Sequence, residues 1–131
     1  MLFEEDFTRV DENIKPFIRA LNRVIWIKTA SSCEGHEGSL YSEPYISFYC
    51  DTRFIKDFCL ILNEIDRAIS EKGLNIKTEL FLVHDREEAN NQTVAPQGWL
   101  ALGLIFRNLD KKGYHKKIFF ERISKLFEEL V

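Results

Sequence analysis

The stretch T-A-S-S-C-E-G-H-E-G, residues 29–38, brings hydroxyls, a thiol, carboxylates, an imidazole and two glycines together within ten residues. It lies between two segments rich in β-branched and aromatic residues, Val24–Thr29 and Tyr45–Cys50, which predict two strands. The connection is longer than a two-residue hairpin turn, and connections of this kind often carry function. We therefore expect a functional loop between two paired strands.

On the N-terminal side of this hairpin, the apolar residues follow helical spacing. The stripe consists of Phe7, Val10, Ile14, Phe17, Ile18, Leu21 and Ile25. Pro16 interrupts it, which leaves two alternatives: a helix that starts near Asp11 with the proline in its first turns, or a helix that bends at the proline.

On the C-terminal side, the pattern predicts a second helix, two further strands and a last helix. Asp51-Thr52 can cap the second helix and Gly73 can end it. Alternation predicts a strand over residues 76–83, and a nearly continuous apolar run predicts a central strand from Trp99 to Phe106. Gly103 within that run indicates a close backbone approach or a bulge. The last helix is expected from Lys112 to Leu130.

This order, α-β-β-α-β-β-α, predicts one α+β domain over residues 1–131 with a mostly antiparallel four-stranded sheet, covered on one face by three helices. The 131 residues suffice for a substantial core, and eleven Phe and two Trp predict that it is rich in aromatic rings. Cys50 and Cys59 fall in or beside core segments and are expected to be buried.

Charge and cysteine content limit the classes of function. The net charge is −3 and the pI is near 5.7, which argues against a broadly basic RNA-binding surface. No apolar run approaches the ~20 residues of a membrane span, and the N-terminus lacks the pattern of a signal peptide. Three cysteines without a C-x-x-C pair favour a reducing compartment, so we expect a cytoplasmic protein that does not contact membranes.

The segment Ser31–His36 is the candidate ligand-binding site. Gly35 allows backbone conformations closed to other residues, so amides here can converge on an anionic group, and Ser31 and Ser32 add hydroxyl donors and acceptors. Glu34 and Glu37 are interpreted as solvated loop charges.

Two further interpretations of the same segment involve Cys33 and His36. Cys33 could be a nucleophile with His36 as its base, which would require a lowered thiol pKa and direct contact. The same two residues could hold zinc, although C-x2-H lacks a matching second pair of ligands. Packing of a small thiol at a strand end is the preferred interpretation, and no metal site is predicted.

Charged residues elsewhere supply weaker candidates. His84, Asp85 and Arg86 follow a predicted strand, and Arg86 could balance the charge of a carboxylate or phosphate. The basic cluster lies at the start of the last helix and is interpreted as solvated; it consists of Lys111, Lys112, His115, Lys116 and Lys117.

Two short motifs resemble the wybutosine-synthesis methyltransferases. The first is V-D-E-N-I-K-P, residues 10–16, with Leu21-Asn22; the second is T-A-S-S-C-E-G, residues 29–35. Members of that family carry I-D-x-x-I-x-P and T-x-S-S-C-S-G-R patterns, whereas this chain has Glu34 in place of the serine and His36 in place of the arginine. The S-S-C-E-G-H form also resembles small uncharacterised microbial proteins.

The resemblance implies a protein that uses S-adenosylmethionine and acts in tRNA modification, with Ser31, Ser32, Cys33 and Gly35 as site residues. Our leading hypothesis is therefore binding of S-adenosylmethionine or a nucleotide at Ser31–His36. The alternatives are a non-enzymatic interaction domain, which could form a homo-oligomer, and a zinc protein that uses Cys33 and His36.

Overall fold

Helices and strands follow one another as the hydrophobic pattern predicts. The computed structural model describes residues 10–35, 43–83, 96–109 and 113–131. The order is η1 (Glu12–Ile14), α1 (Lys15–Asn22), β1 (Ile27–Cys33), β2 (Tyr45–Asp51), η2 (Thr52–Phe54), α2 (Ile55–Glu71), β3 (Lys77–Leu82), β4 (Trp99–Arg107) and α3 (Gly113–Leu130). The predicted α+β class and the order α-β-β-α-β-β-α are confirmed.

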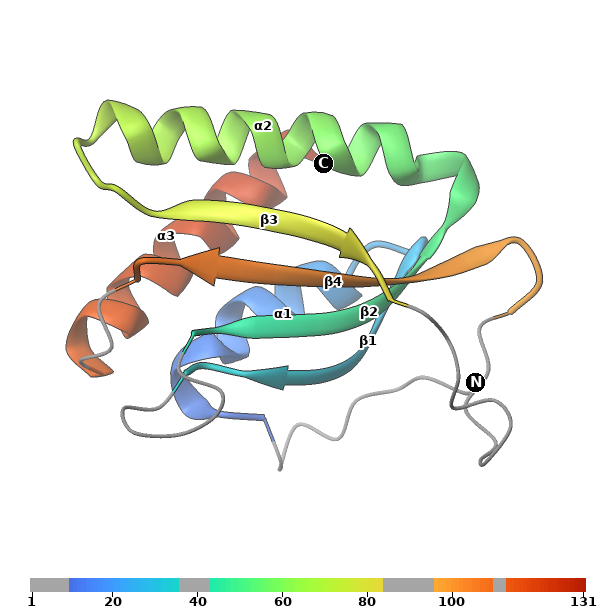
Figure 1. The fold of residues 1–131 in the computed structure, drawn as a ribbon, viewed down its shortest axis with the longest axis horizontal. Helices are drawn as coiled ribbons and strands as arrows, with labels where there is room; N and C mark the ends of the chain where they lie inside the picture. The colour runs from blue at the N-terminus through green and yellow to red at the C-terminus, as the bar shows by residue number, and fades with distance from the viewer. Residues whose placement is uncertain (1–9, 36–42, 84–95, 110–112) are drawn as a thin grey trace.

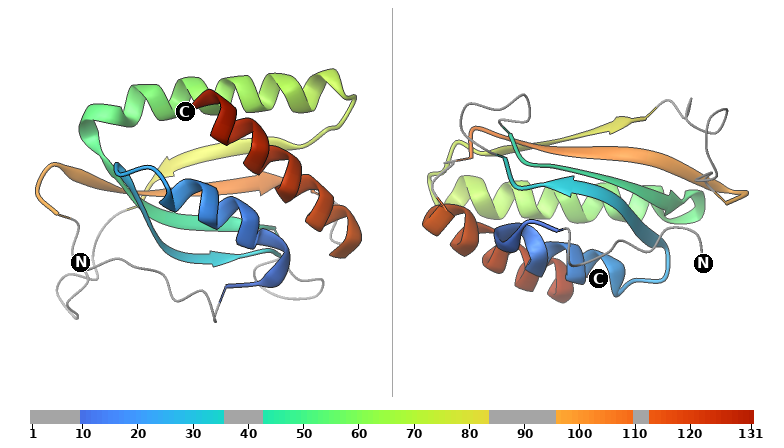
Figure 2. Two further views of the ribbon diagram at one scale, coloured as in Figure 1. Left: turned by 180° about the vertical axis from the view of Figure 1, so that it is seen from behind. Right: turned by 90° about the horizontal axis from the view of Figure 1, so that it is seen from below.

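The four strands form one antiparallel sheet in the order β1-β2-β4-β3, with β1 and β3 at its edges (Figure 1). All three α-helices lie on the same side of the sheet, as the edge-on view of Figure 2 shows. α1 and α3 cross the face of the sheet, whereas α2 runs alongside β3. We call the opposite side of the sheet the open face.

The core between sheet and helices is rich in phenylalanine, as predicted. The rings of Phe17 and Phe106 meet edge to face with centroids 5.9 Å apart, and Phe120 approaches Phe106 at 5.3 Å. On the other side, Phe58 of α2 reaches Phe48 of β2 at 5.2 Å. These contacts join all three helices to the central strands. Aromatic pairs also add stability beyond the area they bury.

The first helix starts at the position that the proline permits. Pro16 lies in the first turn of α1, where its missing N–H costs no helical hydrogen bond, so the alternative with the proline in the first turns is confirmed. The expected stripe is too long at its C-terminal end, because α1 ends at Asn22 and Ile25 is 83% exposed beyond it. Phe7 lies outside the described residues.

The first strand is displaced from its predicted position. It begins at Ile27 rather than Val24 and extends to Cys33, so Ser31, Ser32 and Cys33 belong to β1 and not to the loop. Its register shifts between Thr29 and Ser31, which leaves Ala30 as the extra residue of a β-bulge. Strict alternation would place Ser31 on the buried side with Thr29; the bulge turns it to the open face instead.

The remaining elements lie close to their predicted bounds. Asp51 accepts a hydrogen bond from the Arg53 amide at 3.0 Å and so caps η2, which leads into α2, and α2 ends two residues before Gly73. The last helix ends at Leu130, as predicted, and Leu130 is 37% exposed in its last turn. Among the helices that the structure describes, none combines the length and apolar character needed to cross a membrane.

Candidate functional site

Glu34, directly after β1, is held by side chains from two distant parts of the chain. Only 6% of Glu34 and 3% of Lys116 is exposed, and their charged groups are 2.8 Å apart. Asn13 donates from its backbone to Oε1 of Glu34 at 3.0 Å and from Nδ2 to Oε2 at 2.7 Å. A buried carboxylate requires such partners, since removing it from water without them costs several kcal/mol.

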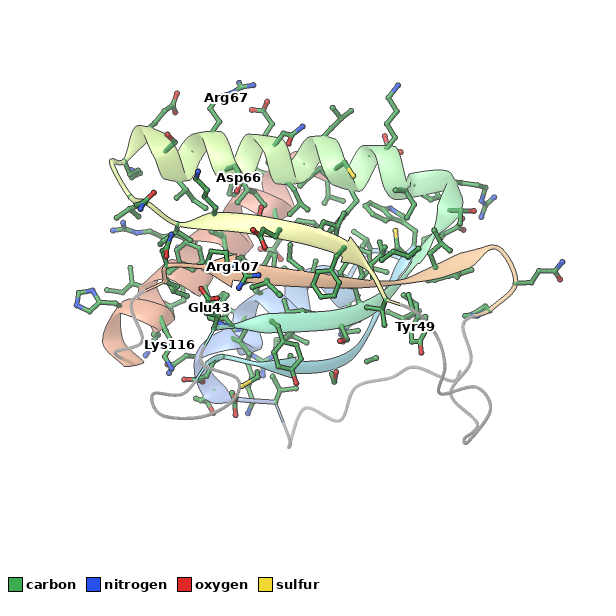
Figure 3. All side chains as sticks on the ribbon, in the orientation of Figure 1. Glu43, Tyr49, Asp66, Arg67, Arg107 and Lys116 are labelled. Atoms are coloured by element: carbon green, nitrogen blue, oxygen red, sulfur yellow. The ribbon has the colours of Figure 1, made fainter. Side chains whose placement is uncertain are left out.

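The backbone around Glu34 is fixed as well. Its amide donates to Oδ2 of Asp11 at 3.0 Å, and Lys116 Nζ donates to the Gly35 carbonyl at 2.7 Å. Gly35 has φ of 84°, a conformation that favours glycine, and its amide points to the Cys33 sulfur at 3.4 Å. We call the set Asp11, Asn13, Glu34 and Lys116 the Glu34 clamp. Lys116 is labelled in Figure 3, near the end of the sheet where β1 stops.

Two predicted solvated charges are therefore buried. Glu34 was interpreted as a loop charge and Lys116 as part of a solvated helix start, and both interpretations are wrong. The reason is tertiary: each charge is buried only because the other meets it, and the two residues are more than 80 positions apart in the chain. The exposed neighbours His115 and Lys117 keep the predicted surface position.

The clamp determines the protonation of the groups within it. Burial alone would raise the pKa of Glu34, but hydrogen bonds from Lys116 and Asn13 outweigh it, so the pKa is lowered. For Cys33 the balance is opposite: burial raises the pKa of the thiol, the Gly35 amide opposes this only partly, and the charges of Asp11 and Glu34 raise it further. The thiol is therefore neutral near pH 7, which weighs against Cys33 as a nucleophile.

Beside the clamp, the strand register places small polar residues in a row across the open face. Ser31 of β1 is paired with Ser47 of β2, and Ser47 with Gly103 of β4. Gly103 is paired with Phe81 of β3, which completes the row. Ser31 is exposed and Ser47 is partly exposed. Ser32 is paired with the buried Ile46 and so lies on the helix-facing side, which means that the two serines do not share a face.

The predicted site residues are thus brought together only in part. Ser31 and Cys33 lie at the end of β1 beside the fixed turn at Glu34 and Gly35, whereas Ser32 is directed to the other side of the sheet. His36 and Arg86, like His84 and Asp85, lie outside the described residues, so their convergence on this turn stays a prediction.

The zinc alternative stays a prediction for the same reason. Within the described residues, no group of three or more His, Cys, Asp or Glu side chains could hold a metal ion. The alternative pair, however, includes His36, which is not among them.

Sequence reasoning missed three contributors to the site. Asp11 and Asn13 belong to the first family-like motif, but nothing in their spacing indicated that they would bind residue 34. Lys116 was noted only as a member of the basic cluster, and nothing in the sequence indicated its burial, because a lysine in the first turns of a helix is ordinarily solvated and interacts unfavourably with the helix dipole.

Comparisons of this chain with protein-family models, with curated proteins and with solved structures find no match.

Proposed function

We propose that this protein binds an adenosine-containing small molecule, with S-adenosylmethionine and nucleotides as the candidates, on the open face of the sheet at the end of β1. The single observation that carries the proposal is the Glu34 clamp, which fixes the turn next to the exposed Ser31 hydroxyl. The resemblance of the two short motifs to the wybutosine-synthesis methyltransferases makes a role in tRNA modification, with methyl transfer as the activity, part of the same proposal.

The physical support is that the buried Glu34–Lys116 pair is explained better by a need for fixed geometry than by a gain in stability. Burying an ion pair removes two charges from water, and a pair of apolar residues would often serve stability equally well. A network of this kind does fix geometry, because every member has partners in defined directions. A fixed turn suits a binding site, since a ligand then loses less free energy to ordering the protein.

In this proposal Ser31 and Cys33 keep the roles that the sequence indicated, and Glu34 takes a different one. Ser31 donates to or accepts from a polar group of the ligand, and Cys33 packs beside it as a neutral thiol. Glu34 does not touch the ligand but positions the turn. We also propose that His36 contributes a proton or a hydrogen bond to the ligand, and Arg86 keeps its predicted role as a balancing positive charge.

Calorimetric titration with S-adenosylmethionine, adenosine, AMP and ATP tests the proposal. Ser31→Ala should weaken binding about 2- to 10-fold, the equivalent of one hydrogen bond of about 0.5–1.5 kcal/mol. Ser70→Ala is the matched control, because Ser70 is exposed on α2. The absence of heat with every ligand, or equal affinities of the wild type and Ser31→Ala, would overturn the proposal.

A second candidate is a non-enzymatic role through self-association, favoured by exposed leucines where β3 and β4 leave the helices. Leu82 of β3 is 65% exposed and is paired with Leu102 of β4, and Leu100, two residues before Leu102, is 39% exposed. Light scattering at high protein concentration distinguishes the candidates: a monomer speaks against self-association, and a dimer that Leu82→Gln dissociates supports it.

A further inference from the structure

Phe81 lies directly on the backbone of β4. A Cβ atom added to Gly103 would come within 2.3 Å of Phe81 Cζ, 2.6 Å of Cε2 and 2.8 Å of Cε1, so only glycine leaves room for the ring. The close backbone approach predicted from Gly103 in an apolar strand is thereby confirmed, with an aromatic ring as the group that approaches. Phe81 is nevertheless 45% exposed, which is unusual for a large apolar side chain with so specific a seat.

The ring borders a hollow on the open face. The hollow has a volume of about 580 Å³ and is lined by Glu79, Leu80, Phe81, Ile105 and Arg107. This size falls within the range of small-molecule sites. The lining combines the Phe81 ring and the Ile105 side chain with charged groups at one end, and small-molecule sites likewise join apolar walls to a few polar groups.

The charged end of the hollow holds two carboxylates and one guanidinium. Arg107 donates to Glu43 Oε1 at 2.6 Å and to Glu79 Oε1 at 2.9 Å (Figure 3 labels Glu43 and Arg107). The second oxygen of Glu43 accepts from the Asn108 amide at 3.1 Å. One guanidinium thus faces two carboxylates, and the net charge of the three side chains is −1. Such an end repels phosphate and suits a hydrogen-bond donor or a cation.

The hollow and the clamp belong to one surface. Ser31, Ser47 and Gly103 are paired in one row, and Phe81 lies over Gly103. Neighbouring strands are about 4.8 Å apart, so roughly 10 Å separate Ser31 from the ring, which is close to the length of a nucleoside.

We propose that Phe81 is the stacking platform for the planar ring of the ligand and that Glu79 accepts a hydrogen bond from an amino group on that ring. The ligand is then a nucleoside-like molecule with an amino-bearing heterocycle, neutral or cationic at this end, whose polar part extends towards Ser31. This inference rests on the proposed function, since it places the second half of the same ligand.

The probes are adenosine and inosine, which differ at the position of the ring amino group. We expect wild-type protein to bind adenosine more tightly than inosine, and Glu79→Ala to reduce that preference at least threefold. Phe81→Ala should weaken adenosine binding about fivefold or more, in keeping with the contribution of one stacked base, whereas Phe81→Tyr should keep the affinity within about twofold. Leu60→Ala is the control, because Leu60 is 53% exposed on α2, away from this face.

The pattern of results separates this inference from the proposed function. If Ser31→Ala weakens adenosine binding and neither Phe81→Ala nor Glu79→Ala does, the platform is overturned and the clamp site stands. If only the Phe81 and Glu79 variants weaken binding, the platform stands and the Ser31 site is overturned. If Phe81→Ala changes only the oligomeric state in light scattering, the face is an interface between copies of the chain and the inference is wrong. Circular dichroism of each variant confirms that it is folded.

Discussion

The two edge strands of the sheet, β1 and β3, each have an outward backbone amide that is bonded by a polar side chain from a helix, but the surroundings of the two amides differ. At the β1 edge, Thr29 donates its amide to Asn22 Oδ1 at 3.0 Å, and its hydroxyl accepts from Asn22 Nδ2 at 2.7 Å. At the β3 edge, the amide of Thr78 lies 3.3 Å from Asp66 Oδ1, and its hydroxyl donates to the same carboxylate at 2.9 Å. In each case a polar side chain from a helix satisfies an outward amide that could otherwise pair with another chain.

The two edges differ in how deeply each threonine is buried and in the residues that follow it along the strand. Thr29 is fully buried, and β1 continues into the Glu34 clamp, where charges are buried and paired. Thr78 is only partly buried, and β3 continues into Leu82, which is 65% exposed. Water can replace a lost partner at β3 but not at β1. We infer that the stability of the β1 edge depends on its specific hydrogen-bond partners, whereas the β3 edge tolerates the loss of such a partner.

The largest expected effect is at the clamp. Lys116→Met removes the cation that faces Glu34 and the donor to Gly35, so that among the described residues the buried carboxylate keeps the two Asn13 donors alone. We expect a loss of about 3–5 kcal/mol in the free energy of unfolding, measured by urea denaturation, because one member of a buried pair is left alone.

The matched control for this prediction is Lys117→Met, the exposed neighbour on the same helix, which should change stability by no more than about 0.5 kcal/mol. A double variant, Glu34→Gln with Lys116→Met, should recover part of the loss, since no unpaired charge is then buried. Equal losses in the Lys116 and Lys117 variants would show that the pair does not stabilise the β1 end.

An intermediate effect compares the two threonines directly. Asn22→Ala leaves the amide and hydroxyl of the buried Thr29 without these partners, at a cost of about 1–3 kcal/mol. Asp66→Ala should cost about 1 kcal/mol or less, because water reaches Thr78. Both are measured by urea denaturation, with Asn63→Ala on the exposed side of α2 as the control. If Asp66→Ala costs as much as Asn22→Ala, the edges do not differ as we infer.

Much of the fold follows from local signals. Asp51 predicts its cap and Gly103 its close approach, because each depends on the chemistry of one residue and its near neighbours. The α-β-β-α-β-β-α order follows in the same way from hydrophobic periodicity within single segments. The bulge at Ala30 has no such signal: it depends on how β1 is paired with β2, and it decides which face Ser31 occupies.

The sequence indicates where in the chain the candidate site lies, but not how its residues are arranged. The density of polar groups near Ser31–Gly35 located it, yet the sequence could not show that Glu34 is buried, because Lys116 comes from the last helix. Two residues of the short motifs make structural hydrogen bonds: Asn22 of α1 bonds Thr29 of β1, and Asn13 of η1 bonds Glu34 directly after β1. These two motif residues therefore hold the N-terminal helical segment against β1.

The smallest expected effect is a pH dependence of the clamp. The pKa of Glu34 is lowered from its ordinary value of 4.5, so the folded protein binds this proton less readily than the unfolded chain does. The contribution of the carboxylate to stability is therefore complete above that value and is lost as the pH falls through the lowered pKa.

Glu34→Gln removes this titration while keeping one oxygen acceptor, so the stability difference between wild type and variant should be full at pH 7 and shrink as the pH falls below 4.5. Urea denaturation across this range measures it. Glu64→Gln, at a partly exposed carboxylate on α2 paired with Arg67 at 2.8 Å, is the matched control and should change stability at pH 7 by no more than about 1 kcal/mol. A gap for Glu34→Gln that stays constant or widens on acidification would mean that Lys116 and Asn13 do not favour the ionised form, and the buried β1 end would then owe its rigidity to packing rather than to charge.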